Sequence, residues 1–393
     1  MGKGREGRWD LVRRHRVLLT VLSIPVVLVL LVLGIMPRAS PLDPRYGASK
    51  AADASTQQAK FSVVIDAGST GSRVHIFKFL TSAAGAQDLQ FDKFEQLKPG
   101  LSSYAADPKA AAASLKPLLA LALETIPEAL HAQTHVSVGA TAGLRMLPGT
   151  KADEILAEVR ALLKTYPFQS AASDVSILTG VNEGAFAWLT LNYLLGRLGE
   201  HEDRTVAAID LGGGSVQEAF AMTAEEAAGA PHANYTTTLS GGGRRYSVYV
   251  YSYLGYGLMA GRAGLQCSFN GAWGGGRVPS VFYISSYFWD RAVDAGLVPE
   301  TAAIEARVKP AEFKKLADKA CSAKLADLGT LFPNVQEAAR PFFCMDLCYV
   351  HTLLLEGFRV PEETEVTIVK KVQYKKEQVE AAWPLGAAIN SLG

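Results

Sequence analysis

Two stretches of the sequence place an aspartate beside a turn rich in glycine and hydroxyl groups. In the first, apolar residues 63–65 are expected to form a buried strand, Asp66 ends it, and residues 67–72 form a turn before a second strand. The backbone N–H groups of such a turn can point at one anion, and the neighbouring carboxylate is placed to hold a cation. The pattern therefore predicts a site for phosphate and a metal ion.

The same pattern recurs in residues 207–220, where an apolar strand leads to Asp210 and to the turn residues 212–215. One glycine-rich turn between strands is usually an ordinary hairpin. Two Asp-x-Gly hairpins in one chain instead predict an internal duplication, with two lobes that face each other across a phosphate.

Hydrolysis of a phosphoanhydride needs neutralised phosphate charge, a metal ion and a water aligned with the leaving oxygen. Asp66 and Asp210 are the candidate metal-binding residues, and because Mg²⁺ keeps several waters they would act through water. Arg73 could pair with phosphate or be a solvated strand residue. The other candidate phosphate-binding residues are Ser69, Thr70, Gly71, Ser72, Thr141, Arg145, Gly212, Gly213 and Gly214.

Glu183 is the candidate general base, because it lies in the first turn of a helix expected to begin near residue 182. Ser215 and Gln217 could orient the attacked water. Taken alone, a glutamate at this position is more often simply stabilised by the helix dipole. Arg145 would more often be a surface residue or the partner of an acid. Only their combination with the two hairpins indicates catalysis.

Strands that alternate with helices predict an α/β fold. The pattern predicts helices over 107–130 and 153–166 and from 182 and 381, and strands over 136–140, 175–178 and 366–372. Residues 246–256 contain five tyrosines and are expected to be a helical packing surface rather than an aromatic ligand box.

The composition is that of a globular protein, with 49% hydrophobic and 20% charged residues. A net charge of +1 gives no reason to expect a nucleic-acid partner. The histidines are scattered, and no zinc site is expected.

The N-terminal residues predict a membrane anchor. Residues 1–16 carry mostly basic charge, and the next twenty residues, 17–36, carry none, which is enough for a helix to span a bilayer. The basic side should stay cytoplasmic, which gives a single-pass type II protein in the Golgi and secretory pathway or the plasma membrane, its bulk lumenal or extracellular. A cleaved signal peptide is the alternative. Residues 37–59 are expected to be a stem.

Two further features have meaning only outside the cytosol. Asn234 begins a glycosylation sequon, although such short motifs also arise by chance. The four cysteines allow three pairings. Cys344 and Cys348 are close enough to bridge locally, and Cys267 with Cys321 would complete the set. Four reduced thiols are the alternative.

From about Lys60 to its C-terminus the chain resembles the apyrases, the nucleoside triphosphate diphosphohydrolases of secretory and cell-surface membranes, and the plant members most closely. Five blocks carry the resemblance: Asp66-Ala-Gly-Ser-Thr-Gly-Ser-Arg73, Ala140-Thr-Ala-Gly-Leu-Arg145, the block with Glu183, Asp210-Leu-Gly-Gly-Gly-Ser-Val-Gln217 and Ala382-Trp-Pro-Leu-Gly386. The resemblance implies a two-lobed actin-like ATPase (ribonuclease H-like) fold.

The resemblance also implies an activity and its residues. It implies sequential removal of the terminal phosphate from nucleoside tri- or diphosphates with Ca²⁺ or Mg²⁺. Glu183 would be the base for water, helped by Ser215 and Gln217. Phe358 lies where similar enzymes stack the nucleobase, and a core phenylalanine is the alternative. Lobe I would span 60–179 and lobe II 180–380, with the final helix 381–393 packing back on lobe I.

The chain departs from the resemblance in two places. Gly214 stands where relatives usually have alanine, which should be tolerated because the turn needs only small residues. Between Ala263 and Cys267 the chain lacks a segment that relatives carry, and that segment ordinarily holds cysteines that pair with positions matching Cys267 and Cys321.

We therefore expect a lumen-facing nucleoside di- or triphosphate phosphohydrolase. The first alternative is a nucleotide- or glycan-binding membrane protein that has lost turnover. The second is an exopolyphosphatase or a kinase of the same superfamily, although no acceptor-substrate site for a kinase is recognisable. The sequence predicts no oligomeric state.

Overall fold

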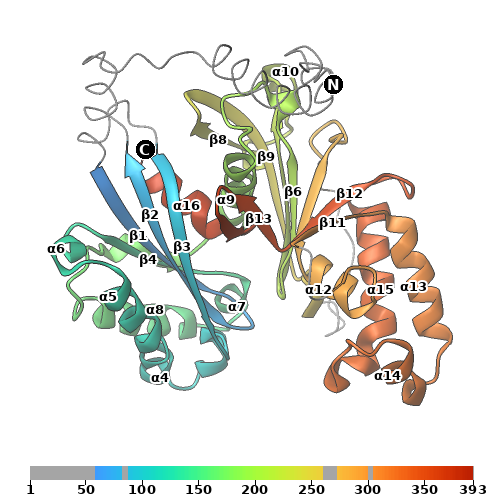
Figure 1. Cartoon of the computed structure of the whole chain (residues 1–393), viewed down its shortest axis with the longest axis horizontal. Coiled ribbons are helices and arrows are strands. Elements are labelled where there is room, and N and C mark those ends of the chain that lie inside the picture. The colour runs from blue at the N-terminus through green and yellow to red at the C-terminus, as the bar shows by residue number, and fades with distance from the viewer. Residues whose placement is uncertain (1–57, 82–86, 260–271, 300–303, 393) are drawn as a thin grey trace, which may run out of the picture. The chain divides into compact units, whose positions relative to one another are not determined.

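The computed structural model describes residues 58–81, 87–259, 272–299 and 304–392. These residues form two mixed sheets covered by helices, which confirms the two-lobed α/β fold (Figure 1). Within these ranges no helix is both long and apolar enough to cross a membrane. The expected anchor at 17–36 lies outside the described residues.

The first sheet has the strand order β3-β2-β1-β4-β5. Its strands are β1 (Gln58–Ala67), β2 (Ser72–Thr81), β3 (Gln87–Leu97), β4 (His135–Ala140) and β5 (Val175–Ile177). The three N-terminal strands form an antiparallel meander, and β4 and β5 join it in parallel.

Helices of the first lobe bury apolar residues against one face of this sheet. They are α4 (Pro108–Ala113), α5 (Lys116–Thr125), α6 (Glu128–His131), α7 (Ala142–Arg145) and α8 (Lys151–Leu163). The single helix expected over 107–130 is therefore three short ones. Pro117 and Pro127 explain the breaks, since proline donates no backbone hydrogen bond and is best tolerated in the first turn of a helix.

The second sheet repeats the topology of the first. Its order is β11-β12-β10-β6-β7-β9-β8. The meander β6-β7-β9 matches β1-β2-β3, and β10 and β12 run parallel to β6 as β4 and β5 do to β1. The strands are β6 (Ala207–Leu211), β7 (Ser215–Met222), β8 (Thr236–Gly241), β9 (Arg244–Leu254), β10 (Phe282–Ser286), β11 (Glu305–Val308) and β12 (Val366–Val369).

The helices of the second lobe are α10 (Ala224–Ala228), α12 (Tyr287–Asp294), α13 (Pro310–Ser322), α14 (Leu328–Leu331) and α15 (Phe343–Thr352), which continues as a π-helical turn over Leu353–Gly357. A two-stranded hairpin, β13 (Lys371–Tyr374) and β14 (Glu377–Glu380), follows β12. The strand expected over 366–372 is thus divided between β12 and β13.

The tyrosine-rich stretch 246–256 is mostly strand β9, so the expectation of a helix was wrong. Its tyrosines at 249, 251 and 253 alternate with Val248 and Val250, which is the two-residue period of a strand. Aromatic and β-branched residues also favour a pleated sheet over a helix.

A core shared by the two sheets contains α9 (Gly180–Leu194) and the final helix α16 (Trp383–Leu392) (Figure 1). It includes Phe77 of the first sheet, Trp188 of α9 and Ala219 of the second sheet. Thr190 links the two helices, because its hydroxyl donates to the Ala382 carbonyl and accepts from the Gly386 N–H, both at 2.8 Å.

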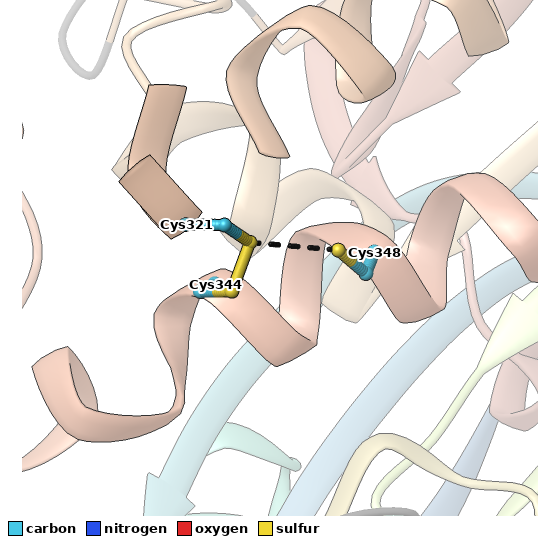
Figure 2. Close-up of side chains that lie close together, drawn as sticks. All are labelled: Cys321, Cys344 and Cys348. Carbon is cyan, nitrogen blue, oxygen red and sulfur yellow. Dashed lines mark hydrogen bonds between the residues drawn. A yellow bond between two sulfur atoms is a disulfide. The ribbon is translucent and has the colours of Figure 1, made fainter. Parts of the chain in front are cut away.

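The disulfide joins Cys321 to Cys344, so both predicted pairs are wrong (Figure 2). The Cα atoms of Cys321 and Cys344 lie 4.8 Å apart, because the end of α13 meets the start of α15. Cys344 and Cys348 are one turn apart on α15, and side chains on one helix face point the same way rather than at each other. Cys321 is thereby unavailable to Cys267, which lies outside the described residues. Cys348 is an exposed free thiol.

Replacing Cys321 by serine should lower the free energy of unfolding by about 3 kcal/mol, the value for a crosslink that closes a loop of this length. Cys321 is the better partner to remove, since Cys348 Sγ lies 3.6 Å from Cys321 Sγ and could replace Cys344. Chemical denaturation of the oxidised proteins measures the difference. Cys348→Ser is the matched control and should unfold like the parent, and an equal loss in both variants would contradict this pairing.

Candidate active site

The two Asp-x-Gly hairpins are built alike. In the first, Asp66 near the end of β1 pairs across the ladder with Arg73 of β2. In the second, Asp210 near the end of β6 pairs with Gln217 of β7. Each aspartate is thus held by a buried strand at the entrance to its turn.

The turns of the two hairpins touch. A Cβ at Gly213 would lie 2.6 Å from Ser69 Oγ, so a larger residue there would require the Ser69 side chain to move. A Cβ at Gly214 would lie 2.8 Å from Ala142 Cβ and 2.7 Å from Met146 Cε. An alanine at Gly214 would therefore require the second turn to shift away from α7.

Asp66 is buried, and only one of its two carboxylate oxygens accepts a hydrogen bond from the described residues. Its Oδ2 accepts a hydrogen bond of 3.1 Å from Arg73 Nη1, so Arg73 is paired with the aspartate rather than free in solvent. Its Oδ1 is buried and has no hydrogen-bond partner among the described residues. Burial raises the pKa of Asp66, and Arg73 opposes this shift.

Asp210 is buried beside the C-terminal end of β10. Its Oδ1 accepts hydrogen bonds from the hydroxyls of Ser286 and, at 3.4 Å, Ser285. Burial raises the pKa of Asp210, the Ser286 hydrogen bond opposes this, and the negative charge of Asp66 adds to it. Ser286 has a φ of 61° and a ψ of −122°, a backbone region that is strained for a residue with a side chain.

The residues present fit a divalent cation. Two buried carboxyls come close enough for one to raise the pKa of the other, and Asp66 Oδ1 has no partner in the described part of the chain. Hard cations take carboxylate oxygens and waters as ligands. A cation between the hairpins would offset the repulsion between the two carboxylates and would give Asp66 Oδ1 a partner.

Glu183 lies in the first turn of α9, as expected. Thr179 caps this helix by accepting a hydrogen bond from the Asn182 N–H at 3.1 Å. Glu183 Oε2 accepts from Arg145 Nη2 at 2.6 Å and from Gln217 Nε2 at 3.2 Å. Burial raises the pKa of Glu183 to about 8, which Arg145 opposes and the charges of the two aspartates reinforce.

Ser215 and Gln217 lie beside Glu183. Gln217 Nε2 is 2.7 Å from Ser215 Oγ and 3.0 Å from Ser252 Oγ, and Arg145 Nη2 donates to Ser215 Oγ at 3.2 Å. Gln217 Oε1 is buried without a hydrogen-bond partner among the described residues. This leaves an acceptor that a water molecule could satisfy.

Sequence reasoning missed three serines of this site, namely Ser252, Ser285 and Ser286. Ser252 pairs with Gln217 across β7 and β9, and Ser285 pairs with Asp210 across β6 and β10. The pairing of neighbouring strands therefore brings these serines to the site. A polar residue inside an apolar strand was the available signal, but the partner strand cannot be identified from one sequence.

A buried charge cluster includes His75 of β2, a strand of the first hairpin. His75 Nδ1 lies 2.9 Å from Asp92, and His75 Nε2 lies 3.1 Å from Glu380. Burial works against charging this imidazole, but the two carboxylates outweigh it and raise the pKa of His75 to about 10. Glu380 also raises the pKa of Asp66 and Asp210. His75 and Asp92 lie on the neighbouring strands β2 and β3, whereas Glu380 comes from β14, so no local sequence pattern marks this cluster.

The other predicted residues divide into two groups. Five of them belong to the hairpin turns, namely Ser69, Thr70, Gly71, Ser72 and Gly212. Thr141 is the N-cap residue of α7, and its backbone N–H donates to the Ala67 carbonyl. Phe358 lies elsewhere. It is buried against Tyr253, whose ring faces the side of the second sheet opposite to Gln217.

Comparison with known proteins identifies the family. The profile of the GDA1/CD39 (nucleoside phosphatase) family matches residues 52–265 and 263–392. The chain belongs to this family. The two matched segments meet at 263–265, which is where the sequence was expected to lack residues that relatives carry.

Several curated relatives of this GDA1/CD39 protein match over most of its length. Probable apyrase 2 of Oryza sativa subsp. japonica is 40% identical, with 97% of this chain and 95% of the relative covered. Apyrase of Solanum tuberosum is 38% identical, with 84% and 87% covered. Human ectonucleoside triphosphate diphosphohydrolase 6 is 33% identical, with 83% and 76% covered.

Solved structures show the same fold at low sequence identity. Nucleoside triphosphate hydrolase of Neospora caninum superposes with a TM-score of 0.58 at 14% identity, covering 89% of this chain and 95% of that one. A Ppx/GppA family member of Aquifex aeolicus gives a TM-score of 0.52 at 15% identity, covering 85% and 98%. These similarities show that this GDA1/CD39 protein shares the fold, and they do not identify its substrate.

Proposed function

We propose that this GDA1/CD39 protein hydrolyses the terminal phosphate of nucleoside tri- or diphosphates with water as the acceptor. The observation that carries the proposal is the buried cluster of Glu183, Gln217 and Ser215 beside the two aspartate hairpins. Relatives named apyrase and nucleoside-triphosphatase support it.

Asp66 and Asp210 would hold a divalent cation, Ca²⁺ or Mg²⁺, directly or through its waters. When bound, the cation supplies positive charge that neutralises phosphate oxygens. The backbone of the two turns, together with Ser69, Thr70 and Ser72, donates further hydrogen bonds to phosphate. Arg73 and Arg145 add positive charge at the two sides of the site.

Glu183 acts as the general base. Both of its described hydrogen bonds go to Oε2, which leaves Oε1 for the water. The buried acceptor Gln217 Oε1 takes a second hydrogen bond from this water and fixes its direction. As the water oxygen bonds to phosphorus, its proton passes to Glu183 and the bond from phosphorus to the bridging oxygen breaks. The products are inorganic phosphate and a nucleotide one phosphate shorter.

The remaining expectations stay part of the proposal. Residues 17–36 would anchor the protein in a membrane, 37–59 would be the stem, and the bulk would be lumenal or extracellular. Asn234, which is exposed, would carry a glycan. Lobe I at 60–179, lobe II at 180–380 and the returning helix 381–393 are the corresponding domain boundaries, and Phe358 is the proposed nucleobase contact.

The proposed function is tested by phosphate release from the secreted fragment 45–393. ATP, ADP, GDP and UDP are compared with Ca²⁺, with Mg²⁺ and with chelator. Cation-dependent release is expected. A folded protein that binds these nucleotides without releasing phosphate would overturn the proposal and leave a binding role.

We expect Ser286 to affect cation binding through its hydrogen bond to Asp210. Removing its hydroxyl with Ser286→Ala is expected to weaken cation affinity by about tenfold, as losses of outer hydrogen bonds to metal ligands do. Ser286→Gly removes the same hydroxyl but relieves the backbone strain at φ 61°, so it should be about 1 kcal/mol more stable than Ser286→Ala. Cation titration and thermal unfolding measure the two effects. Unchanged cation affinity in both variants would exclude the positioning role.

A further inference from the structure

Glu380 adds a third carboxylate to the surroundings of the two aspartate hairpins. It is the last residue of β14 and lies just before α16, the helix in the core shared by the two sheets. Burial is the main reason that the pKa of Asp66 and of Asp210 is raised, and the negative charge of Glu380 adds to both shifts. Glu380 is therefore close enough to act on both halves of the candidate cation site.

An ion pair with His75 fixes the position and the charge of Glu380. His75 Nε2 lies 3.1 Å from Glu380 Oε2, while His75 Nδ1 lies 2.9 Å from Asp92. Burial opposes ionisation of Glu380, but His75 and Arg73 outweigh it and lower the pKa of Glu380. Glu380 is thus a carboxylate at neutral pH. Because one imidazolium serves two carboxylates, the cluster keeps an excess of negative charge.

The strand register places Glu380 at the end of this cluster that faces the cation site. His75 lies two residues after Arg73 on β2, so both side chains point to the same face of the sheet. Burial would lower the pKa of Arg73, but the charges of Asp66 and Glu380 raise it. Asp92 instead pairs across the ladder with Phe77, four residues farther from the hairpin turn than Arg73. Of the two carboxylates that hold His75, Glu380 is therefore the one near the site.

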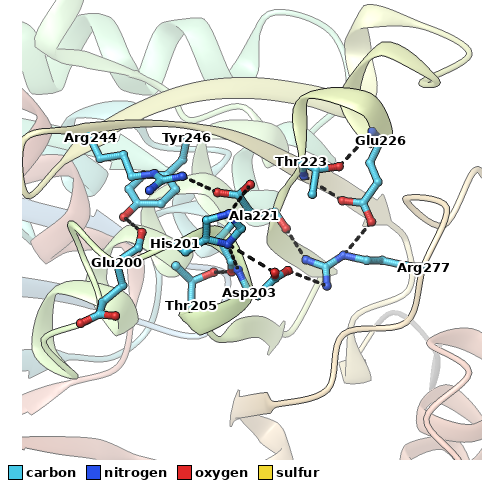
Figure 3. A network of polar contacts seen from close by, with 11 residues as sticks. Glu200, His201, Asp203, Thr205, Ala221, Thr223, Glu226, Arg244, Tyr246 and Arg277 are labelled. Carbon is cyan, nitrogen blue, oxygen red and sulfur yellow. Dashed lines mark hydrogen bonds and ion pairs between the residues drawn. The ribbon is translucent and has the colours of Figure 1, made fainter.

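An exposed counterpart of this cluster lies at the other end of the second sheet (Figure 3). His201 lies 3.4 Å from Glu202 and 3.3 Å from Asp203, so it too stands between two carboxylates. Its side chain is 55% exposed, against 2% for His75. These residues precede β6, whose far end carries Asp210. Water and salt screen such exposed charges, so this second cluster supplies matched controls.

We propose that Glu380 sets the cation affinity of the candidate site through its charge, without being a ligand of the cation. A cation between Asp66 and Asp210 is attracted by each nearby negative charge in proportion to its own charge. Partial burial keeps this attraction from being fully screened. The inference rests on the proposed function in one respect, because the cation is part of that function.

Calorimetric titration of the full chain with Ca²⁺, in the absence of nucleotide, tests the proposal. Glu380→Gln keeps the size of the side chain and an oxygen that can accept from His75, but it loses the charge. Its Ca²⁺ affinity should fall roughly tenfold, the scale of one unit charge acting through partly buried surroundings. Glu380→Asp keeps the charge on a shorter side chain and should retain most of the affinity.

The charge of the cation gives a second readout. Coulomb energy is proportional to the charge of the ion, so Glu380→Gln should weaken the binding of Tb³⁺ by a larger factor than that of Ca²⁺. A merely structural defect would weaken both ions alike. Thermal unfolding without cation checks that each variant is folded.

Two control variants separate charge near the site from the support of His75. Asp92→Asn removes the other carboxylate that holds His75, and it should lower the Ca²⁺ affinity much less than Glu380→Gln does. Asp203→Asn removes a carboxylate beside the exposed His201 and should leave the affinity unchanged. If Glu380 only supported His75, then Asp92→Asn would lose as much Ca²⁺ affinity as Glu380→Gln, and the proposal would be overturned.

The remaining outcomes also decide the proposal. Equal Ca²⁺ affinity of the wild type and Glu380→Gln overturns it and leaves the proposed hydrolysis standing. A loss in Glu380→Asp as large as that in Glu380→Gln overturns it as well, because shape and not charge would then matter. A wild type that binds neither Ca²⁺ nor Mg²⁺ has the same consequence. The expected losses in a protein that releases no phosphate would support the role of Glu380 while contradicting the proposed function.

Discussion

Replacing Glu183 by glutamine is expected to lower phosphate release by roughly 10²–10⁴-fold, the contribution of a positioned general base. Glutamine keeps the size of the side chain and can still accept the hydrogen bond from Arg145 through its amide oxygen. It cannot take a proton from water. Nucleotide affinity should therefore persist, and the loss should fall on kcat rather than on KM.

The pH profile gives this prediction a second readout. Because burial raises the pKa of Glu183 to about 8, the base is protonated at low pH and becomes active as the pH rises. In the wild type, kcat/KM should therefore rise as the pH passes through about 8, which is above the pH at which an ordinary carboxyl titrates. The residual rate of Glu183→Gln should show no such rise. A bound cation would shift the rise to lower pH.

Glu124→Gln on α5 is the surface control for this experiment. It changes an exposed glutamate in the same way and should leave the rate and its pH profile intact. Wild-type turnover in a folded Glu183→Gln protein would remove Glu183 from the role of base. A loss confined to KM would assign it to binding instead.

The second large effect is expected from Asp210→Asn. Asparagine keeps an oxygen that can accept from Ser286 but removes one of the two negative charges beside the turns. The affinity for Ca²⁺ or Mg²⁺ should fall by about 100-fold, and turnover at subsaturating cation should fall with it. Calorimetric titration of the cation without nucleotide measures this directly.

Thermal unfolding supplies an activity-free check of the same variant. A cation that binds only the folded protein raises its melting temperature in proportion to the logarithm of its concentration. The wild type and Asp327→Asn, which alters an exposed aspartate of the second lobe, should show this rise. Asp210→Asn should not show it at the same concentrations. Equal rises in all three proteins would place the cation elsewhere.

The elements that the sequence predicted well are those with local signals. Each of the two hairpins is marked by an apolar strand, an aspartate and a glycine turn, and the helix expected from residue 182 is α9, which begins at Gly180. The repeat of the hairpin also predicted two lobes, which the matching strand orders of the two sheets bear out. Such features depend on neighbours within a few residues.

The features that were wrong or missed depend on distant partners. The pairing of Cys321 with Cys344 follows from the meeting of two helix ends, which sequence spacing does not contain. Ser286 reaches Asp210 only because β10 lies beside β6. At β9 the signal is local, since its tyrosines alternate with Val248 and Val250 at the two-residue period of a strand.

The measurement that tests the central claim most directly is hydrolysis of GDP or ATP in water enriched with ¹⁸O, with a saturating divalent cation. Attack of water on the terminal phosphorus predicts one labelled oxygen in each inorganic phosphate released and none in the nucleotide product. Label in the nucleotide, or no phosphate from a protein that binds nucleotide and cation, would contradict a role for Glu183, Ser215 and Gln217 in directing water at the terminal phosphate.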